Sequence, residues 1–259
     1  MTSTGRAGLI IAVDGPSGSG KSSAARGAAR ALGLRYLDTG AMYRAATLWM
    51  LRHDIDVTDP AAVAVSAHRP VIEVGTDPDE PDGPAVILDG AVVTAPIRTR
   101  EVSNAVSAVS AVPAIRARLV AMQRSIIAAS VRGASAPEEA GGPGGGGGPA
   151  RGDGGTSGIV IEGRDIGTVV VPEAQVKVFL TASEATRAQR RTKDMADDPA
   201  ATLRVTQREM TRRDRLDSTR SASPLLKADD AVEIDSTRLG LDEVIAQIVA
   251  LAQQRTVSA

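Results

Sequence analysis

The segment GPSGSGKSSA, Gly15 to Ala24, follows the apolar run Leu9–Val13 and overlaps the start of the alanine-rich stretch Lys21–Leu32. It fits the pattern G-x-x-x-x-G-K-[ST] without a gap, in the context that the pattern requires, after a strand and before a helix. Glycines let backbone N–H groups close around phosphate oxygens, and a helix N-terminus favours negative charge. We therefore predict a nucleoside triphosphate site at Gly15, Pro16, Ser17, Gly18, Ser19, Gly20, Lys21, Ser22 and Ser23.

Two side chains of this loop have predicted chemical roles. The ammonium group of Lys21 can reach the β- and γ-phosphates, and the hydroxyl of Ser22 can bind Mg²⁺. Lys21 is one of only four lysines in a chain that has 26 arginines. This scarcity argues against the alternative of an incidental lysine in a glycine-rich turn.

The composition indicates an α/β protein with one main core. The chain has 259 residues, of which 42% are hydrophobic and only 2% aromatic, so burial must come from Ala, Val, Leu and Ile. The absence of cysteine excludes a disulfide framework, a thiolate metal site and a cysteine nucleophile. A net charge of −1 argues against a general nucleic-acid binder, because such proteins neutralise phosphates with a basic surface.

The apolar segments are short. No run approaches the roughly 18 apolar residues of a membrane span, and GLIIAV near the N-terminus is too short for a signal peptide. We therefore expect a cytoplasmic protein that does not bind membranes. We also expect a monomer and, from the net charge, no binding of nucleic acid.

Strand-like runs alternate with long helical stretches, which is typical of a parallel sheet covered by helices. The runs are Leu9–Val13, Gly158–Glu162, Val176–Leu180 and Ala231–Asp235. Proline follows a capping or boundary residue at Asp59-Pro60, Val112-Pro113 and Asp198-Pro199, which predicts three helix starts.

Two segments interrupt this alternation. Between Arg69 and Thr94 the strand-like pieces are short and broken by Pro and Gly, which predicts a small antiparallel sheet inserted into the core. Residues Gly133 to Gly158 hold 12 of the 26 glycines and little that could be buried, so we predict a flexible, solvated excursion.

Charged residues cluster in four blocks: Asp38–Arg44, Ile97–Arg116, Ile161–Pro172 and Arg212–Leu225. Carboxylates and arginines at strand ends of an open α/β sheet face the crevice where ligands bind. We expect such residues, Asp165 among them, to be partly exposed. Surface ion pairing is the alternative for any one block.

A further group of arginines, Arg187, Arg190 and Arg191, has the spacing of one helix face. One interpretation is a lid that closes these arginines onto a transferring phosphoryl group. The other is a solvated helix face that pairs with Glu184.

Taken together, DGPSGSGKSS, LDTGAMYR, IRTREVSNAVSAVSAVPAIR, EGRDIGTVVVPEAQVKVFLTAS, RAQRR and RRDRLDSTRSASPL resemble the bacterial cytidylate kinases in order and spacing. The resemblance covers nearly the whole chain except Gly133–Gly158. The phosphate loop is shared with many kinases, whereas the EGRDIGT and RDxxDSxRxxSPL blocks are specific.

The resemblance implies ATP-dependent phosphorylation of CMP and dCMP on a three-layer α/β/α core with a parallel five-stranded sheet. It also implies a division of the chain into core residues 1–40 with the phosphate loop and a monophosphate-binding region 41–118 with an insert at about 69–95. Core residues 119–180, which contain the excursion 133–158, would follow, then a lid with flanking helices at 181–212 and further core at 213–259.

Carried over by position, the resemblance assigns the acceptor phosphate to Arg44, Arg164 and Arg220, the cytosine to Ser107, Arg116 and Asp165, and the sugar to Arg213 and Asp217. Thr39 and Glu162 stand where we expect Ser and Asp in relatives, and we retain both as substrate-binding residues. The predicted catalytic residues, which would position and stabilise the transferring group, are Lys21, Arg44, Arg164, Arg187, Arg190, Arg191 and Arg220.

The sequence thus predicts direct in-line transfer of the γ-phosphoryl group of Mg-ATP, with no side chain acting as nucleophile. Cytosine offers the N4 amino group as a donor with N3 and O2 as acceptors, which suits a carboxylate and a hydroxyl at one edge and an arginine at the other. Two alternatives remain open. One is a phosphate-loop kinase for another acceptor such as UMP or shikimate; the other is a nucleotide-dependent switch protein, although no guanine-reading N-K-x-D motif is present.

Overall fold

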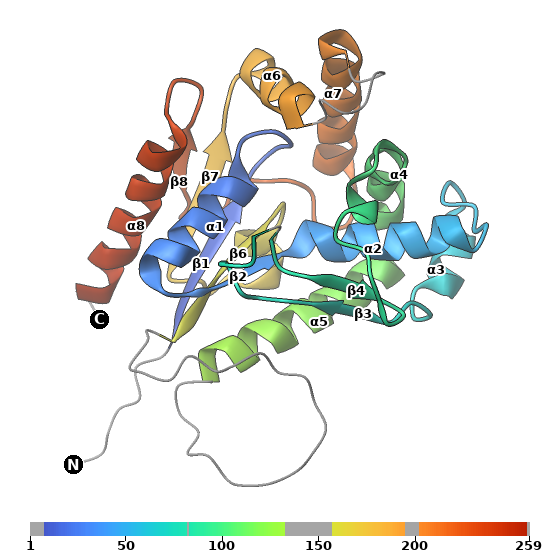
Figure 1. The fold of residues 1–259 in the computed structure, drawn as a ribbon, viewed down its shortest axis with the longest axis horizontal. Helices are drawn as coiled ribbons and strands as arrows, with labels where there is room; N and C mark the ends of the chain where they lie inside the picture. The colour runs from blue at the N-terminus through green and yellow to red at the C-terminus, as the bar shows by residue number, and fades with distance from the viewer. Residues whose placement is uncertain (1–7, 82, 133–156, 195–201, 258–259) are drawn as a thin grey trace, which may run out of the picture.

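The computed structural model describes residues 8–81, 83–132, 157–194 and 202–257. Within these residues the chain forms a parallel sheet of five strands in the order β2-β6-β1-β7-β8 (Figure 1). The strands are β1 (Leu9–Asp14), β2 (Arg35–Asp38), β6 (Gly158–Gly163), β7 (Val176–Thr181) and β8 (Val232–Asp235). The predicted fold class and the four predicted strands are confirmed.

Helices cover both faces of this sheet (Figure 1). The helices α1 (Lys21–Leu32) and α8 (Leu241–Val257) cover one face, and α2 (Thr39–Arg52) and α5 (Pro113–Arg132) cover the other. The described residues also form α3 (Pro60–Ser66), α4 (Arg100–Ala111), α6 (Glu184–Asp194) and α7 (Leu203–Thr219), which pack on other helices. Strand alternation divides the core: Ile11 and Val13 pack on the side of α1 and α8, whereas Ala12 faces the side of α2 and α5.

Two of the predicted helix starts are confirmed by local structure. Asp59 accepts a hydrogen bond from the Ala61 N–H at 2.9 Å, with Pro60 as the first residue of α3, and α5 begins at Pro113. The third predicted start, Asp198-Pro199, and most of the predicted glycine-rich excursion lie outside the described residues.

The predicted insert is also confirmed. Strands β3 (Ile72–Val74), β4 (Val86–Leu88) and β5 (Ala91–Val92) form a small antiparallel sheet that packs on α2. Arg26 and Arg30 of α1 donate to the carbonyl of Pro78 at 2.8 and 2.7 Å, which ties the insert to the helix that follows the phosphate loop. The division into core, monophosphate-binding region and lid stays a prediction.

In the described part of the chain, no single helix is long and apolar enough to cross a membrane. The helices α4 and α5, which meet at an angle of 97°, pass that test only as a pair, by length and composition.

Candidate functional site

The phosphate loop lies between β1 and α1 and needs its glycines. Gly15, Gly18 and Gly20 have φ of 147°, 74° and 90°, a region that residues with a Cβ rarely adopt. A Cβ on Gly15 would collide with the Leu180 carbonyl, and one on Gly18 would lie 2.8 Å from the Arg187 carbonyl oxygen. The loop therefore packs directly against β7 and α6, where only a backbone fits.

Lys21 lies buried beneath this loop, with its ammonium group 2.7 Å from the Pro16 carbonyl oxygen. Burial, together with the positive charge of Arg164, lowers the pKa of Lys21 from 10.5 to about 7, although Glu162 and Asp14 oppose the shift. Such an environment favours an anion beside the ammonium group, because a negative charge would offset the cost of desolvation.

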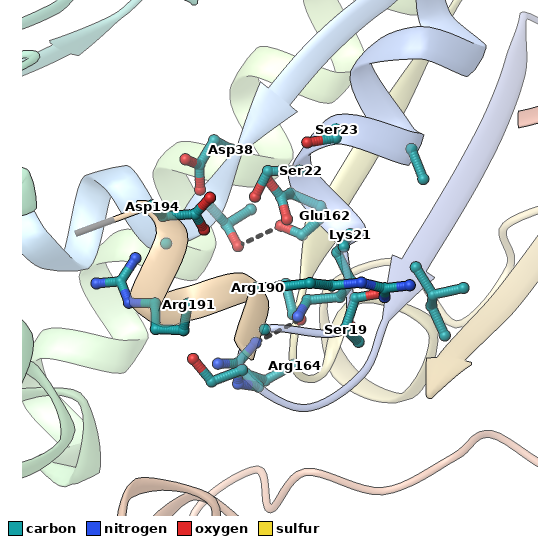
Figure 2. Close-up of a pocket in the computed structure, with 18 of the residues that line it drawn as sticks. Ser19, Lys21, Ser22, Ser23, Asp38, Glu162, Arg164, Arg190, Arg191 and Asp194 are labelled. Carbon is teal, nitrogen blue, oxygen red and sulfur yellow. Dashed lines mark hydrogen bonds between the residues drawn. The ribbon is translucent and has the colours of Figure 1, made fainter. Parts of the chain in front are cut away.

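A cavity of about 550 Å³ opens beside the loop, at the carboxyl ends of β1, β2 and β6 (Figure 2). Most of the predicted site residues line it: Ser17, Gly18, Ser19, Gly20, Lys21, Ser22, Ser23, Thr39, Arg44, Arg116, Glu162, Arg164, Asp165, Arg190, Arg191, Arg213, Asp217 and Arg220. Four predicted residues stand behind this lining, namely Gly15, Pro16, Ser107 and Arg187. Residues from distant segments of the chain therefore meet at this edge of the sheet, as expected for side chains at the ends of parallel strands.

One wall of the cavity is a buried network around Asp165. Its carboxylate pairs with Arg116, and Arg220 Nη2 lies 3.8 Å from Asp165 Oδ1. Asp165 is only 5% exposed, so the expectation of a partly exposed strand-end residue is wrong. The reason is that the cleft side chains pair with one another; burial raises the pKa of Asp165, while the two arginines oppose that shift.

Asp217 is the centre of a second network. It accepts hydrogen bonds from Ser107 Oγ at 3.2 Å and from Arg164 Nε at 3.0 Å, and Arg213 Nε lies 3.9 Å away. Burial raises the pKa of Asp217, but the positive charges of Arg164 and Arg213 outweigh burial, so the pKa lies below its usual value. Ser107 thus reaches the cavity through Asp217.

Positive charge accumulates where the acceptor phosphate is predicted. Burial lowers the pKa of Arg44, and so do the nearby charges of Arg213 and Arg191. Burial and the charge of Arg164 lower the pKa of Arg213 to about 10. Arg44 and Arg191 both donate to the hydroxyl of Ser103, at 2.8 and 3.2 Å. These arginines repel one another across the cavity, an arrangement that an anionic ligand would relieve.

The three arginines predicted on one face of α6 divide between two environments. Arg190 donates to the hydroxyl and the carbonyl of Ser236 at 2.8 and 2.7 Å, and with Arg191 it lines the cavity (Figure 2). Arg187 points beneath the loop, donates to the Ser17 carbonyl at 3.0 Å and pairs with Asp214. Arg187 therefore braces the phosphate loop, and its predicted contact with a phosphoryl group stays a prediction.

We expect Arg187→Ala to lower the free energy of unfolding by about 2–3 kcal/mol, because Asp214 and the Ser17 carbonyl would lose a charged donor in a largely buried place. A thermal melt measures this loss. Arg204→Ala, at an exposed position of α7, is the control. An unchanged melt with lost turnover would contradict the bracing role and favour direct contact with the phosphoryl group.

Residues near Glu162 could hold a metal ion with the loop. Tyr36 donates to the Glu162 carboxylate at 2.5 Å, and Thr39 donates to its carbonyl at 2.7 Å. Burial raises the pKa of Glu162, whereas a hydrogen bond from Ser22 lowers it. No cluster of three or more His, Asp or Glu suited to a metal occurs in the described ranges. Hydroxyl and carboxylate oxygens beside a phosphate loop nevertheless fit Mg²⁺, which takes one or two such ligands with substrate phosphates.

Sequence reasoning missed several residues of the site. Leu239, Leu241 and Val244 follow β8 in the chain and line the same cavity as Arg190 and Ser236. The position of Ser236, directly after the last strand, is a signal that could have found these residues. Asp14, the last residue of β1, was also missed: it does not line the cavity but accepts hydrogen bonds from the backbone that follows Asp165.

The family model described as "Cytidylate kinase" matches residues 11–132 and 152–254. A cytidylate kinase of Streptomyces griseus subsp. griseus is 46% identical over 256 residues, which cover 99% of this chain and 97% of the relative. One of Rhodococcus jostii is 47% identical over 253 residues, covering 96% of both chains. One of Mycobacterium leprae is 45% identical over 249 residues, covering 96% and 97%. The chain belongs to the cytidylate kinase family.

Proposed function

We propose that this protein transfers the γ-phosphoryl group of ATP to CMP and dCMP, giving CDP and dCDP. The observation that carries the proposal is the convergence of Arg44, Arg164, Arg191 and Arg213 on one cavity beside the phosphate loop. This much positive charge on the wall of one cavity suits the phosphates of two nucleotides. The family supports cytidylate as the acceptor.

The donor nucleotide would occupy the part of the cavity next to α1. Backbone N–H groups of the loop and the ammonium group of Lys21 would hold its phosphates, as loops of this pattern do. Leu239, Leu241 and Val244, which line the same cavity as Arg190, offer an apolar surface for a flat base. Arg guanidinium planes stack on aromatic faces, which suits this place.

The acceptor would occupy the opposite part of the cavity. Arg44, Arg164 and Arg220 would bind its phosphate. Ser107, Arg116 and Asp165 would read the cytosine, while Arg213 and Asp217 would contact the sugar. Asp165 and Asp217 are held by arginines before the ligand arrives, so their positions cost little to organise on binding.

Catalysis in this site rests on alignment and charge stabilisation. The attacking oxygen belongs to the acceptor phosphate, so no side chain has to act as a nucleophile. Mg²⁺, when bound with ATP, supplies charge neutralisation at the phosphates, and Ser22 would hold it. Lys21, Arg190 and Arg191 would face the negative charge that develops on the transferring group.

An ATP-consumption assay tests this function. We expect turnover with CMP and dCMP and little with UMP, AMP or shikimate. Faster turnover with UMP or shikimate than with CMP would show that the acceptor is that compound and not cytidylate. Slow ATP hydrolysis that no acceptor accelerates would instead indicate a switch protein. We further propose that the protein acts as a monomer in the cytoplasm, which sedimentation and cell fractionation test.

A further inference from the structure

Asp14 is a carboxylate at the end of a strand that is otherwise apolar and buried. Its own exposed fraction is 5%. Its Oδ1 accepts a hydrogen bond from the Ile166 N–H at 2.9 Å, and its Oδ2 accepts one from the Gly167 N–H at 2.8 Å. The last residue of β1 therefore holds the first residues of a turn that follows β6, about 150 positions later in the chain.

This turn is a single turn of π-helix, Ile166–Val170, and side chains of opposite charge hold its two ends. Asp14 accepts from its N–H groups, and Arg124 of α5 donates to the carbonyls of Val169 and Val170 at 2.8 and 3.0 Å. The space around the turn is tight, because a Cβ on Gly167 would lie 3.1 Å from Lys177 Cδ. The turn thus has little freedom to shift while both contacts persist.

The position of Asp14 in the chain links this turn to the phosphate loop. The next residue, Gly15, begins the loop, and its carbonyl accepts a hydrogen bond from Arg164 Nη1 at 2.9 Å. Arg164 and Asp165 directly precede the turn. Asp14 and Gly15 therefore both bind the segment that begins with Arg164 and Asp165, the two predicted contacts of the acceptor.

Burying a carboxylate at this place costs folding free energy unless hydrogen bonds compensate its desolvation. Burial and, to a smaller extent, the negative charge of Asp165 raise the pKa of Asp14 to about 6, while its two backbone N–H partners and Lys21 oppose that shift. At neutral pH the group is a charge held in the protein interior, and such groups are kept where hydrogen bonds compensate their desolvation.

We propose that Asp14 is a positioning residue for the acceptor: by fixing the turn Ile166–Val170, it sets Arg164 and Asp165 at a fixed distance from the phosphate loop. This inference rests on the proposed function, because it takes Arg164 and Asp165 as contacts of the acceptor nucleotide. Asp14 itself touches neither substrate. Loss of Asp14 should therefore weaken binding of the acceptor and leave binding of the donor nucleotide at the phosphate loop unchanged.

The variant Asp14→Asn tests the inference. Asn has the same shape but turns one acceptor into a donor that faces a backbone N–H, so one contact is lost and the turn is loosened. We expect the KM for CMP to rise at least tenfold and the KM for ATP to stay within about twofold of the wild type. Hydrogen exchange of the Ile166 and Gly167 amides should accelerate, while the amides of β1 keep their protection.

Two further variants complete the experiment. Asp59→Asn makes the same chemical change at another carboxylate that accepts a backbone N–H, at the start of α3, and should leave both KM values unchanged. Arg124→Gln loosens the other end of the turn and should raise the KM for CMP at least threefold, with faster amide exchange. If Asp14→Asn does not fold, Arg124→Gln alone tests whether fixing this turn sets the KM for CMP.

Three outcomes bear on the inference in different ways. Equal rises in the KM for CMP and for ATP would overturn it, because Asp14 would then act on the loop. Faster exchange of the turn with an unchanged KM for CMP would also overturn it. A wild-type enzyme that phosphorylates a different monophosphate would overturn the proposed function; a rise in the KM for that acceptor alone, in Asp14→Asn, would still support the positioning role.

Discussion

Replacing Lys21 with alanine is expected to lower phosphoryl transfer at least about 10³-fold while the protein stays folded. Contacts that stabilise the charge of a transferring phosphoryl group are worth about 10³ or more in rate. The ammonium group of Lys21 has the Pro16 carbonyl as its hydrogen-bond partner and faces the cavity, not the apolar core. Turnover with saturating ATP and CMP, beside a thermal melt, measures both parts of the prediction.

The pKa of Lys21 explains why the melt should not suffer. Its folded-state pKa of about 7 lies below the unfolded value of 10.5, so between these pH values the folded protein binds the proton less tightly than the unfolded chain. Burial of Lys21 therefore costs stability in full below about pH 7, and this cost falls as the pH rises from about 7 to 10.5; removing the side chain does not add to it.

Lys227→Ala is the matched control for this variant. Lys227 is 44% exposed in its side chain and pairs with Glu233 on the surface, so its loss should leave turnover and the melt unchanged. A Lys21→Ala enzyme that melts normally and keeps more than a tenth of wild-type turnover would contradict the assignment of Lys21 to the transferring phosphate.

The strong local signals of the sequence were sufficient for most of the fold. Asp59-Pro60 and Pro113 start helices because a capping carboxylate and a fixed φ act within a few residues. Apolar strands buried on both faces give continuous runs, as in Leu9–Val13. The edge strand β2 is harder to predict because it has only four residues and begins with an exposed Arg35.

The candidate site was less predictable because its contacts join distant segments. Asp14 meets Ile166 and Gly167 across 152 and 153 positions, and Ser236 meets Ser19 across 217. No local sequence pattern predicts such pairs. The burial of Asp165 depends in the same way on Arg116 and Arg220, whose approach is a property of the folded chain. Motif spacing found the residue types but not their partners.

Asp165→Asn is expected to narrow the preference for CMP over UMP, measured as the ratio of their kcat/KM values, by at least about tenfold. If the Asp165 carboxylate accepts from the cytosine amino group, UMP presents an oxygen to a buried negative charge. A mismatch of this kind can discriminate by about 10⁴ in sites built on hydrogen bonds. Asparagine replaces half of the acceptor with a donor, which weakens CMP and relatively favours UMP.

The same variant should also lose stability, because Asp165 is buried and paired with Arg116. Breaking a buried ion pair by removing one partner costs about 3–5 kcal/mol. Asparagine keeps one oxygen acceptor, so we expect about 3 kcal/mol or less, which corresponds to a fall in Tm of up to roughly 10 °C. Kinetics are therefore to be measured well below the melting transition of the variant.

Asp217→Asn separates base reading from general damage to the cavity. Asp217 is 4% exposed, similar to Asp165, and its carboxylate is likewise held by two arginines, but we assign it to the sugar. This variant should lower kcat/KM for both CMP and UMP, because both nucleotides carry ribose, and should change the CMP to UMP ratio less than Asp165→Asn does, because Asp217 meets the base-reading set only through Ser107. If Asp165→Asn leaves the ratio unchanged, Asp165 serves to hold Arg116 and Arg220 in place and does not read the base.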